Sequence, residues 1–248
     1  MLRGFVKLTW LEIKIFVREP LGLVGTLIIP VAVFLLFGRS VSSGAARSHR
    51  VAELLGERMP ILIALLMVFN AVISLVTVIS IYREGGILKR LRATPLRPTT
   101  ILGAQVVVKL VFTAASLALL MLAGRRFYPV ELNVHVISFT IALLFSTLSI
   151  LTIGFVIASL VPTARFAQPI AGVILYPTLA LCGLFSPVAS LPRAWATLGS
   201  MLPITHAVSL MRGAWGGESW LNHFADVGVL SLNILVCVAL SARIFRWK

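Results

Sequence analysis

Long hydrophobic runs separated by short polar segments make up most of this chain. A helix needs about 20 mostly apolar residues to cross the hydrocarbon core of a bilayer. Six stretches have that character, at residues 21–37, 61–82, 101–123, 135–161, 166–185 and 224–242. The pattern predicts an all-α polytopic membrane protein in which residues 1–248 form one transmembrane domain with six spans. The first stretch lies far from the start and lacks a small-residue cleavage pattern, so we expect an uncleaved anchor rather than a signal peptide.

The first 19 residues have an amphipathic pattern at helical periodicity. Arg3, Lys7, Lys14 and Arg18 fall on one side of such a helix, and most of the opposite side is apolar. This pattern predicts an interfacial helix along the inner leaflet, which Pro20 ends before the first span. The helix either only anchors and orients the chain or also borders a cytoplasmic partner.

The composition is that of a membrane protein, with 59% hydrophobic and 12% charged residues. An average soluble domain carries about 25% charged residues. The net charge of +14 therefore indicates topology and attraction to anionic headgroups, so membrane lipids are expected partners and nucleic acid is not. If the amino terminus is inside, the inner segments are the denser in Lys and Arg, as the positive-inside rule requires. We expect a multi-pass protein of the cell membrane with both termini cytoplasmic.

Few residues in the predicted spans carry reactive groups. Both cysteines, Cys182 and Cys237, lie inside apolar stretches and are expected to be core residues. The histidines are scattered at no metal-ligand spacing, at positions His49, His135, His206 and His223. The spans contain no paired carboxylates, which disfavours a proton-coupled carrier. We expect neither a metal site nor a catalytic residue in this chain.

The polar residues within the spans are expected to have structural roles. Lys109 is near enough to the inner end of its helix to extend its ammonium group to the headgroups. The others are expected to form hydrogen bonds between helices. They are Asn70, Gln105, Thr147, Thr152 and Asn233.

The residues that precede the lysines exclude one kind of ATP-binding site. A phosphate-binding P-loop needs a Gly-Lys pair, so that backbone amides and the lysine ammonium group surround the phosphates. No lysine of this chain follows a glycine. The chain therefore lacks an ATP site of this type.

Residues 82–96, YREGGILKRLRATPL, concentrate charge between two apolar stretches. Gly85 and Gly86 are expected to end the preceding helix, and Pro95 limits the next one to roughly two turns at 87–94. Leu88 and Leu91 share an edge of this short helix, which otherwise is mostly basic. A helix of this length needs a packing partner. Composition leaves open whether that partner is the headgroup region or a protein groove.

The segment at 186–220 is too apolar for a free loop, yet prolines and Gly216-Gly217 interrupt it. Its apolar pieces have the lengths of re-entrant or interfacial segments. Two arrangements remain open from the residues alone: a re-entrant helical hairpin, or a pair of helices lying on the surface.

Two motifs resemble the ATP-binding-cassette (ABC) type-2 transporter permease family. One is RE-GG-ILKRLRATP in the loop at 83–100, and the other is GLFSPVASLP followed by LPITHAVSLMRG before the last span. The amphipathic start, the six spans and the hairpin also match this family in order. The resemblance implies a coupling contact with a separate nucleotide-binding subunit. The implied contact residues are Arg83, Glu84, Gly85, Gly86, Leu88, Lys89, Arg90, Leu91, Thr94 and Pro95.

The same resemblance implies the permease subunit of an ABC exporter for an amphipathic, drug-like or lipid-linked compound. Its expected partners are a P-loop ATPase, which would hold the ATP and magnesium, and a second permease copy or a homologous permease. It also favours the re-entrant hairpin, with candidate outer-gate residues Pro187, Pro192, Pro203, His206 and Arg212. The alternatives are an integral-membrane lipid-modifying enzyme and an ATP-independent secondary carrier. Cargo identity stays open, as does homodimer against heterodimer.

Overall fold

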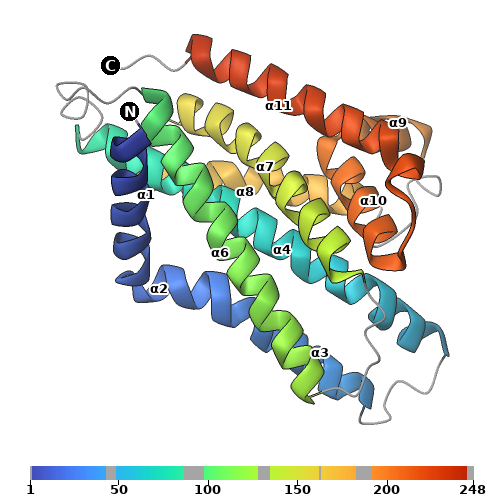
Figure 1. Ribbon diagram of the computed structural model, residues 1–248. Coiled ribbons are helices and arrows are strands. Elements are labelled where there is room, and N and C mark those ends of the chain that lie inside the picture. The colour runs from blue at the N-terminus through green and yellow to red at the C-terminus, as the bar shows by residue number, and fades with distance from the viewer. Residues whose placement is uncertain are drawn as a thin grey trace.

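The computed structural model describes residues 2–42, 49–86, 98–127, 135–161, 163–182 and 192–244. Within these ranges all regular structure is helical, as the hydrophobic pattern predicted (Figure 1). The helices are α1 (Leu2–Val17), α2 (Pro20–Leu23), the π-helix η1 (Val24–Ile28), α3 (Ile29–Ser42), α4 (His49–Glu84), α6 (Pro98–Phe127), α7 (Val136–Leu160), α8 (Ala164–Leu181), α9 (Arg193–Met201), α10 (Pro203–Gly216), the 3₁₀-helix η3 (Trp220–His223) and α11 (Phe224–Ile244).

In the described part of the chain, four helices are long and apolar enough to cross a membrane. They are Ile61–Glu84 in α4, Thr100–Phe127 in α6, Val136–Leu160, and Trp220–Ser241 in η3 and α11. The first predicted stretch contains a shorter apolar helix, Val24–Leu36. The stretch at 166–185 overlaps α8, which contains Pro169 and Pro177. The count of six spans therefore remains a prediction.

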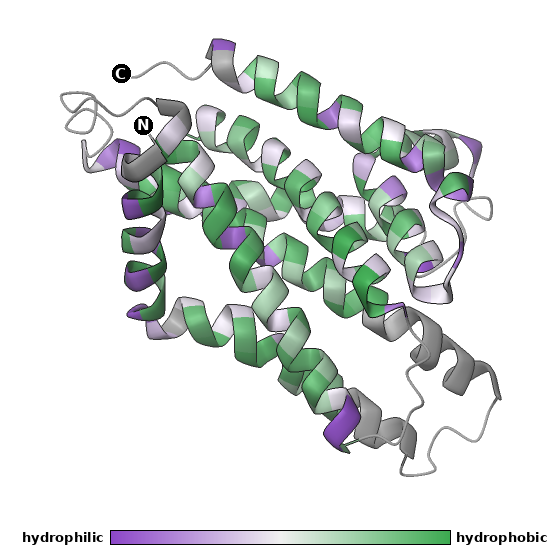
Figure 2. Ribbon diagram, in the orientation of Figure 1, coloured by the Kyte–Doolittle hydropathy of each residue, from purple (hydrophilic) through white to green (hydrophobic). Residues whose placement is uncertain are grey.

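Helix α7 forms the centre of the bundle and packs against α4, α10 and α11. Its side chains Phe139, Leu143, Ile150 and Leu151 are almost completely buried in the hydrophobic core. Most of the bundle is hydrophobic along its length, and hydrophilic positions gather on α1 and around the turn before α11 (Figure 2). The core is thus built mostly from the apolar runs that defined the predicted spans, and α10 of the segment at 186–220 adds to it.

The predicted bonds between helices form at two positions. The Asn233 side chain on α11 donates to the Ser149 carbonyl and hydroxyl oxygens on α7, at 2.9 and 3.0 Å. The Asn70 amide on α4 donates to the Thr26 hydroxyl of η1 at 3.1 Å. Two other residues behave differently, because Thr147 and Thr152 donate to carbonyl groups of their own helix. Threonine hydroxyls reach carbonyls of the preceding turn easily, and sequence alone does not exclude that geometry.

The first predicted span contains an irregular turn. Pro30 has no N–H to donate to the Thr26 carbonyl four residues earlier. The Ser116 hydroxyl of α6 donates to that carbonyl instead, at 2.9 Å. The backbone over Val24–Ile28 is π-helical, and the Ile29 N–H reaches back to the Val24 carbonyl. A helix interrupted at membrane depth is tolerated when a neighbouring side chain satisfies the freed carbonyl.

Both chain termini lie at the same end of the bundle (Figure 1). We call this the terminal end, and it also holds the last turn of α4, the start of α6 and the α7–α8 junction. The opposite end, which holds α9, α10 and η3, is called the hairpin end. The coupling helix predicted at 87–94 and the predicted gate residue Pro187 lie outside the described residues.

Candidate functional site

The last turn of α4 ends the helix with a left-handed glycine. Gly86 has φ +65°, and its N–H donates to the Arg83 carbonyl at 3.2 Å. A side chain at Gly86 would meet nothing within 4 Å, so the backbone angle rather than space requires glycine. Gly85 still continues the helical bonding, with its N–H donating to the Ile81 carbonyl. Gly86 therefore sets where α4 ends and where the predicted coupling loop begins.

Arg83 caps the end of α7. Its Nη1 group donates to the carbonyl oxygens of Ala158 and Ser159, both at 3.3 Å. The last four carbonyls of a helix have no partner within it, and a positive charge is favourable there. Arg83 thereby fastens the end of α4 to the end of α7.

Glu84 binds the other side of the same junction. The Ala164 N–H, at the first residue of α8, donates to Glu84 Oε2 at 2.8 Å. A carboxylate near a helix N-terminus satisfies a free N–H and interacts favourably with the helix dipole. Arg83 and Glu84 thus hold the α7–α8 junction from both sides, and we call this pair the α4 clamp. The family resemblance directed both residues toward a partner subunit, and the structure gives each a partner within the chain.

Tyr82 joins the end of α4 to α1. Its hydroxyl lies 2.7 and 2.9 Å from the two carboxylate oxygens of Glu12 and donates to that group. Glu12 is only 7% exposed. Sequence reasoning missed Glu12, although an acidic residue four positions before Phe16, amid the apolar residues of α1, was a usable signal.

Lys109 does not extend to the surface as the sequence suggested. It is 3% exposed, and its Nζ lies 2.6 Å from the Ser74 hydroxyl of α4. The same nitrogen lies over the Phe16 ring of α1, 4.6 Å from the ring centroid. Glu12 and Glu19 also attract it. The correction has a clear cause, because a hydroxyl, an aromatic face and two nearby carboxylates stabilise the ammonium group inside the protein.

The remaining predicted coupling residues cannot be placed beside this clamp. Leu88, Lys89, Arg90, Leu91, Thr94 and Pro95 all lie outside the described residues. The structure therefore brings together Arg83, Glu84, Gly85 and Gly86, and adds Glu12, Tyr82 and Lys109, which the motif did not include.

The predicted gate residues that the structure describes lie on, or directly before, the two helices of the hairpin end. Pro192 is the residue before α9 and is exposed, and Pro203 is the first residue of α10. Arg212 lies exposed on α10. Helix α10 buries Ile204, Ala207, Val208, Leu210, Met211, Gly213 and Ala214. That burial makes α10 part of the bundle core rather than a helix lying on its surface.

Beyond α10 the chain turns into α11, and η3 packs on α7. The Trp220 indole Nε1 donates to the Ser138 hydroxyl at 2.8 Å. Nearby, the Trp215 ring of α10 meets the Phe139 ring edge-on, with centroids 5.0 Å apart. These aromatic contacts pack α10 and η3 against the first turn of α7.

His206 belongs to a row of alternating histidines and acids. Its Nδ1 lies 2.7 Å from Asp226 Oδ1, and its Nε2 lies 3.0 Å from the Ser200 carbonyl. Asp226 Oδ2 lies 2.9 Å from His223 Nδ1, and His223 Nε2 lies 3.1 Å from Glu218 Oε2. Sequence reasoning treated these histidines as scattered, and only the spacing of His223 and Asp226 on one helical turn hinted at contact. Among the described residues, no group of three or more His, Cys, Asp or Glu is arranged to hold a metal ion.

Comparisons with known proteins bear on most of the chain. A model of the ABC-2 type transporter family matches residues 3–215. Two curated relatives, both called nodulation protein J, come from Rhizobium leguminosarum bv. viciae and bv. trifolii. They are 28% and 27% identical to this chain over 99 residues, which is 40% of this chain and 38% of each relative. The chain thus spans less than half the length of these relatives. Since the family match covers most of its residues and its helices are long and apolar, the chain is an integral membrane protein that belongs to the ABC-2 type transporter family.

Proposed function

We propose that this chain is the permease subunit of an ATP-driven exporter. A separate P-loop ATPase hydrolyses ATP with magnesium and drives transport. The cargo is an amphipathic, drug-like or lipid-linked compound that leaves the cytoplasm or the inner leaflet. Membership of the ABC-2 type family supports this reading.

The observation that carries the proposal is the α4 clamp. Force applied to the loop after Gly86 reaches the end of α4 first. Arg83 and Glu84 tie that end to the last turn of α7 and the first turn of α8. A displacement of the loop therefore moves three helices together. In the proposed mechanism this unit is the two-state element that the partner's nucleotide state biases.

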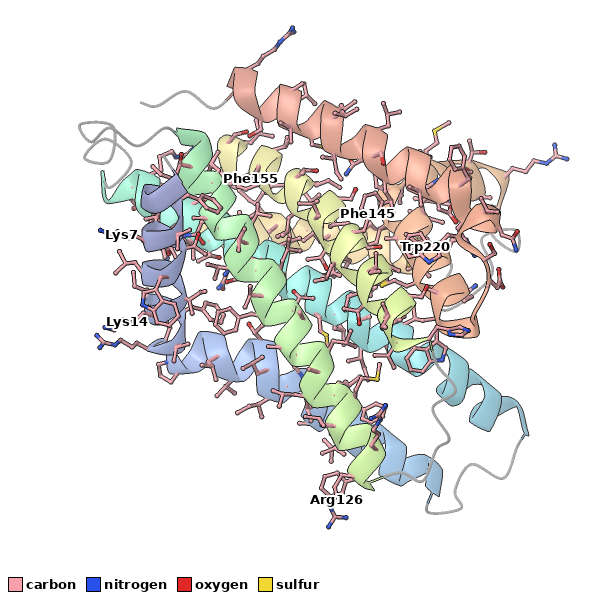
Figure 3. All side chains as sticks on the ribbon, viewed as in Figure 1. Lys7, Lys14, Arg126, Phe145, Phe155 and Trp220 are labelled. Carbon is pink, nitrogen blue, oxygen red and sulfur yellow. The ribbon has the colours of Figure 1, made fainter. Side chains whose placement is uncertain are left out.

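The placement of α1 supports an orientation with the terminal end inside the cell. Lys7 and Lys14 point away from the bundle, as Figure 3 shows. The apolar side chains Val6, Trp10 and Leu11 are more than half exposed. This combination of exposed cations and exposed apolar residues suits a helix at the inner headgroup boundary. In this arrangement the chain crosses the membrane six times and α9–α10 forms the re-entrant hairpin of the outer end.

Helix α8 supports a second permease copy as a partner. Tyr176 is 58% exposed and lies near the middle of the predicted span 166–185. A phenol group at that depth lacks a hydrogen-bond partner among lipid tails. In contrast, the exposed residues of α11 are mainly aliphatic, such as Leu232, Leu235 and Val236. We therefore place α8 at the interface with the second copy and α11 against lipid.

Co-purification tests the core of the proposal. The tagged chain, extracted in mild detergent from its own host, should retain an ATPase of the P-loop type. Reconstituted vesicles of the complex should hydrolyse ATP. Absence of any such ATPase, together with transport that survives ATP depletion, would leave the secondary carrier as the better reading.

Substitutions in the α4 clamp test its role in coupling. Glu84→Ala removes the acceptor for the Ala164 N–H, whereas Glu84→Gln keeps an acceptor oxygen. We expect Glu84→Ala to uncouple ATP hydrolysis from transport, and Glu84→Gln to retain most coupling. Arg165→Ala is the control, because Arg165 is exposed in the first turn of α8 at the same end. Equal losses in Glu84→Gln and Glu84→Ala would instead assign Glu84 a charge contact with the ATPase.

Cross-linking tests the place of α8. A cysteine at Val173, which is 74% exposed on α8, should form a disulfide with a second copy in the membrane. A cysteine at Leu235, 68% exposed on α11, should not. The reverse result would move the interface to α11.

A further inference from the structure

The row His206, Asp226, His223 and Glu218 joins separate elements at the hairpin end. His206 belongs to α10, Asp226 to α11, His223 to η3, and Glu218 to the turn between α10 and η3. Through its second ring nitrogen, His206 also reaches the Ser200 carbonyl in the last turn of α9. The row therefore connects both helices of the hairpin to the start of the last helix.

The partners of the two imidazole rings determine how many protons the row holds. A neutral imidazole has one N–H donor and one acceptor nitrogen. His206 faces a carbonyl oxygen on one side and a carboxylate on the other, and His223 faces two carboxylates. Carbonyl oxygens and ionised carboxylates only accept. Each ring can therefore make both of its contacts only as the doubly protonated imidazolium.

With both rings protonated, positive and negative charges alternate along the row and cancel. The side chains of His206, Asp226 and His223 are 22%, 14% and 13% exposed, whereas Glu218 is 56% exposed. The Asp226 end of the row is therefore shielded from water, and the Glu218 end is open to it. Ser209, one turn along α10, also lies near Asp226. Two further ionisable residues at the hairpin end are His135, whose ring lies beside Gly217, and Arg212, which is exposed on α10.

Tight packing holds the His223 ring in place. A Cβ atom at Gly213 of α10 would overlap this ring. The ring therefore lies directly against the α10 backbone, and the position of η3 is coupled to that of α10. A movement of the His223 ring that follows a change in its hydrogen bonds therefore has to displace α10, because the ring and the α10 backbone are in direct contact.

We propose that these four side chains bind two protons and form a proton-dependent latch that holds the α9–α10 hairpin against α11. Loss of either proton leaves a ring nitrogen lone pair facing an acceptor oxygen, so one contact is lost and the two atoms repel. The latch is closed while the protons are bound, and it opens as pH rises. Because this inference depends only on the geometry of the hairpin end, it holds or fails independently of the proposed ATP-driven export. If the chain is an exporter, the latch controls the outer end of its path.

Nitrogen NMR of the histidine rings tests the protonation. The full chain carries four histidines, and ¹⁵N labelling in lipid nanodiscs with a metal chelator gives one set of ring signals for each. His206→Gln and His223→Gln assign the two of interest. We expect the His223 ring, which faces two carboxylates, to carry two N–H groups at about pH 7.5, where an ordinary imidazole is mostly neutral. A neutral His223 ring at that pH would overturn the proposal.

A distance measurement tests the movement. Spin labels replace Leu198 on α9 and Leu232 on α11, both exposed, in a chain carrying Cys182→Ala and Cys237→Ala. We expect one short distance at about pH 5.5 and a second, longer one at about pH 8.5, on either side of the ordinary imidazole titration. His206→Gln and His223→Gln should abolish this pH dependence, and His135→Gln should retain it. An unchanged distance in the parent chain, or pH dependence that persists in both latch variants, would show that the row is not a latch.

Discussion

The ammonium nitrogen of Lys109 lies 4.6 Å from the centroid of the Phe16 ring, and this contact joins α6 to α1. The Phe16 ring also packs against Phe112 of α6, with centroids 4.3 Å apart. Ser74 of α4 binds the ammonium group from the other side. One buried cation thus connects the amphipathic helix at the start of the chain with two helices of the bundle.

A double-mutant cycle on this pair should reveal the cation–π contact. Phe16→Leu keeps an apolar side chain, and Lys109→Met keeps most of the lysine stem without the charge. We expect a coupling of about 0.5–2 kcal/mol in the free energy of unfolding, measured in mixed micelles. As a control, Phe69→Leu removes a ring that pairs with Tyr176. Its change in the free energy of unfolding should simply add to that of Lys109→Met. Simple additivity of Phe16→Leu and Lys109→Met would contradict the contact.

Because Tyr82 donates to Glu12, a Tyr→Phe substitution should cost more stability at residue 82 than at residue 176. Tyr82→Phe leaves the buried Glu12 carboxylate without this donor, and we expect a loss of about 1–3 kcal/mol in stability. Tyr176→Phe, at a position that is exposed in the single chain, should stay within about 0.5 kcal/mol of the parent when the chain is dispersed as monomers. Unfolding in mixed micelles measures both. Equal stability of the two variants would show that the Tyr82 hydroxyl contributes nothing.

The stability cost of Ser116→Ala should depend on whether residue 30 is proline, because both residues affect the bonding of the Thr26 carbonyl. Ser116→Ala should cost about 0.6 kcal/mol, a typical value for a hydrogen bond between membrane helices. In a Pro30→Ala background the cost should shrink, because the new N–H can donate to the same carbonyl. Ser159→Ala, whose hydroxyl donates within its own helix, should respond equally in both backgrounds. The same Ser116→Ala cost with and without Pro30 would refute this account.

The close contact between Gly213 and the His223 ring predicts that a methyl group added at residue 213 destabilises the hairpin end. Gly213→Ala places a Cβ against the His223 ring, and we expect a loss of about 1–3 kcal/mol from overpacking. Gly228→Ala on α11 meets nothing within 4 Å and should gain up to about 1 kcal/mol from helix propensity. Thermal unfolding at one pH compares the two. If Gly213→Ala is as stable as Gly228→Ala, the ring is not packed as the structure shows.

Local features of the fold could be predicted from sequence where neighbouring residues decide them. Gly86 ends α4 because a left-handed backbone favours glycine, and Pro20 begins a new helix after α1. The apolar runs give the helices, because burial or lipid contact of those side chains is needed wherever they pack. The ends of the helices are less predictable: α4 begins at His49, although the membrane span within it starts at Ile61, as predicted.

The candidate sites were predicted only in part. The motif pointed to Arg83 and Glu84, but their partners at Ala158, Ser159 and Ala164 are 75 to 80 residues away in sequence. Such pairings depend on how α4, α7 and α8 pack, and no spacing within the motif reports that. The same holds for Lys109, whose burial depends on where α1 lies.

The sequence by itself determined that this is a helical membrane protein, where its apolar runs lie and that it lacks a Gly-Lys phosphate loop. Those properties depend on composition and on contacts between near neighbours. The tertiary structure alone decided that Arg83 and Glu84 clamp the α7–α8 junction, and that His206 and His223 meet at Asp226. Helix packing sets these relations, because a side chain's partner across a bundle depends on the rotation and depth of both helices, which periodicity along one helix does not fix.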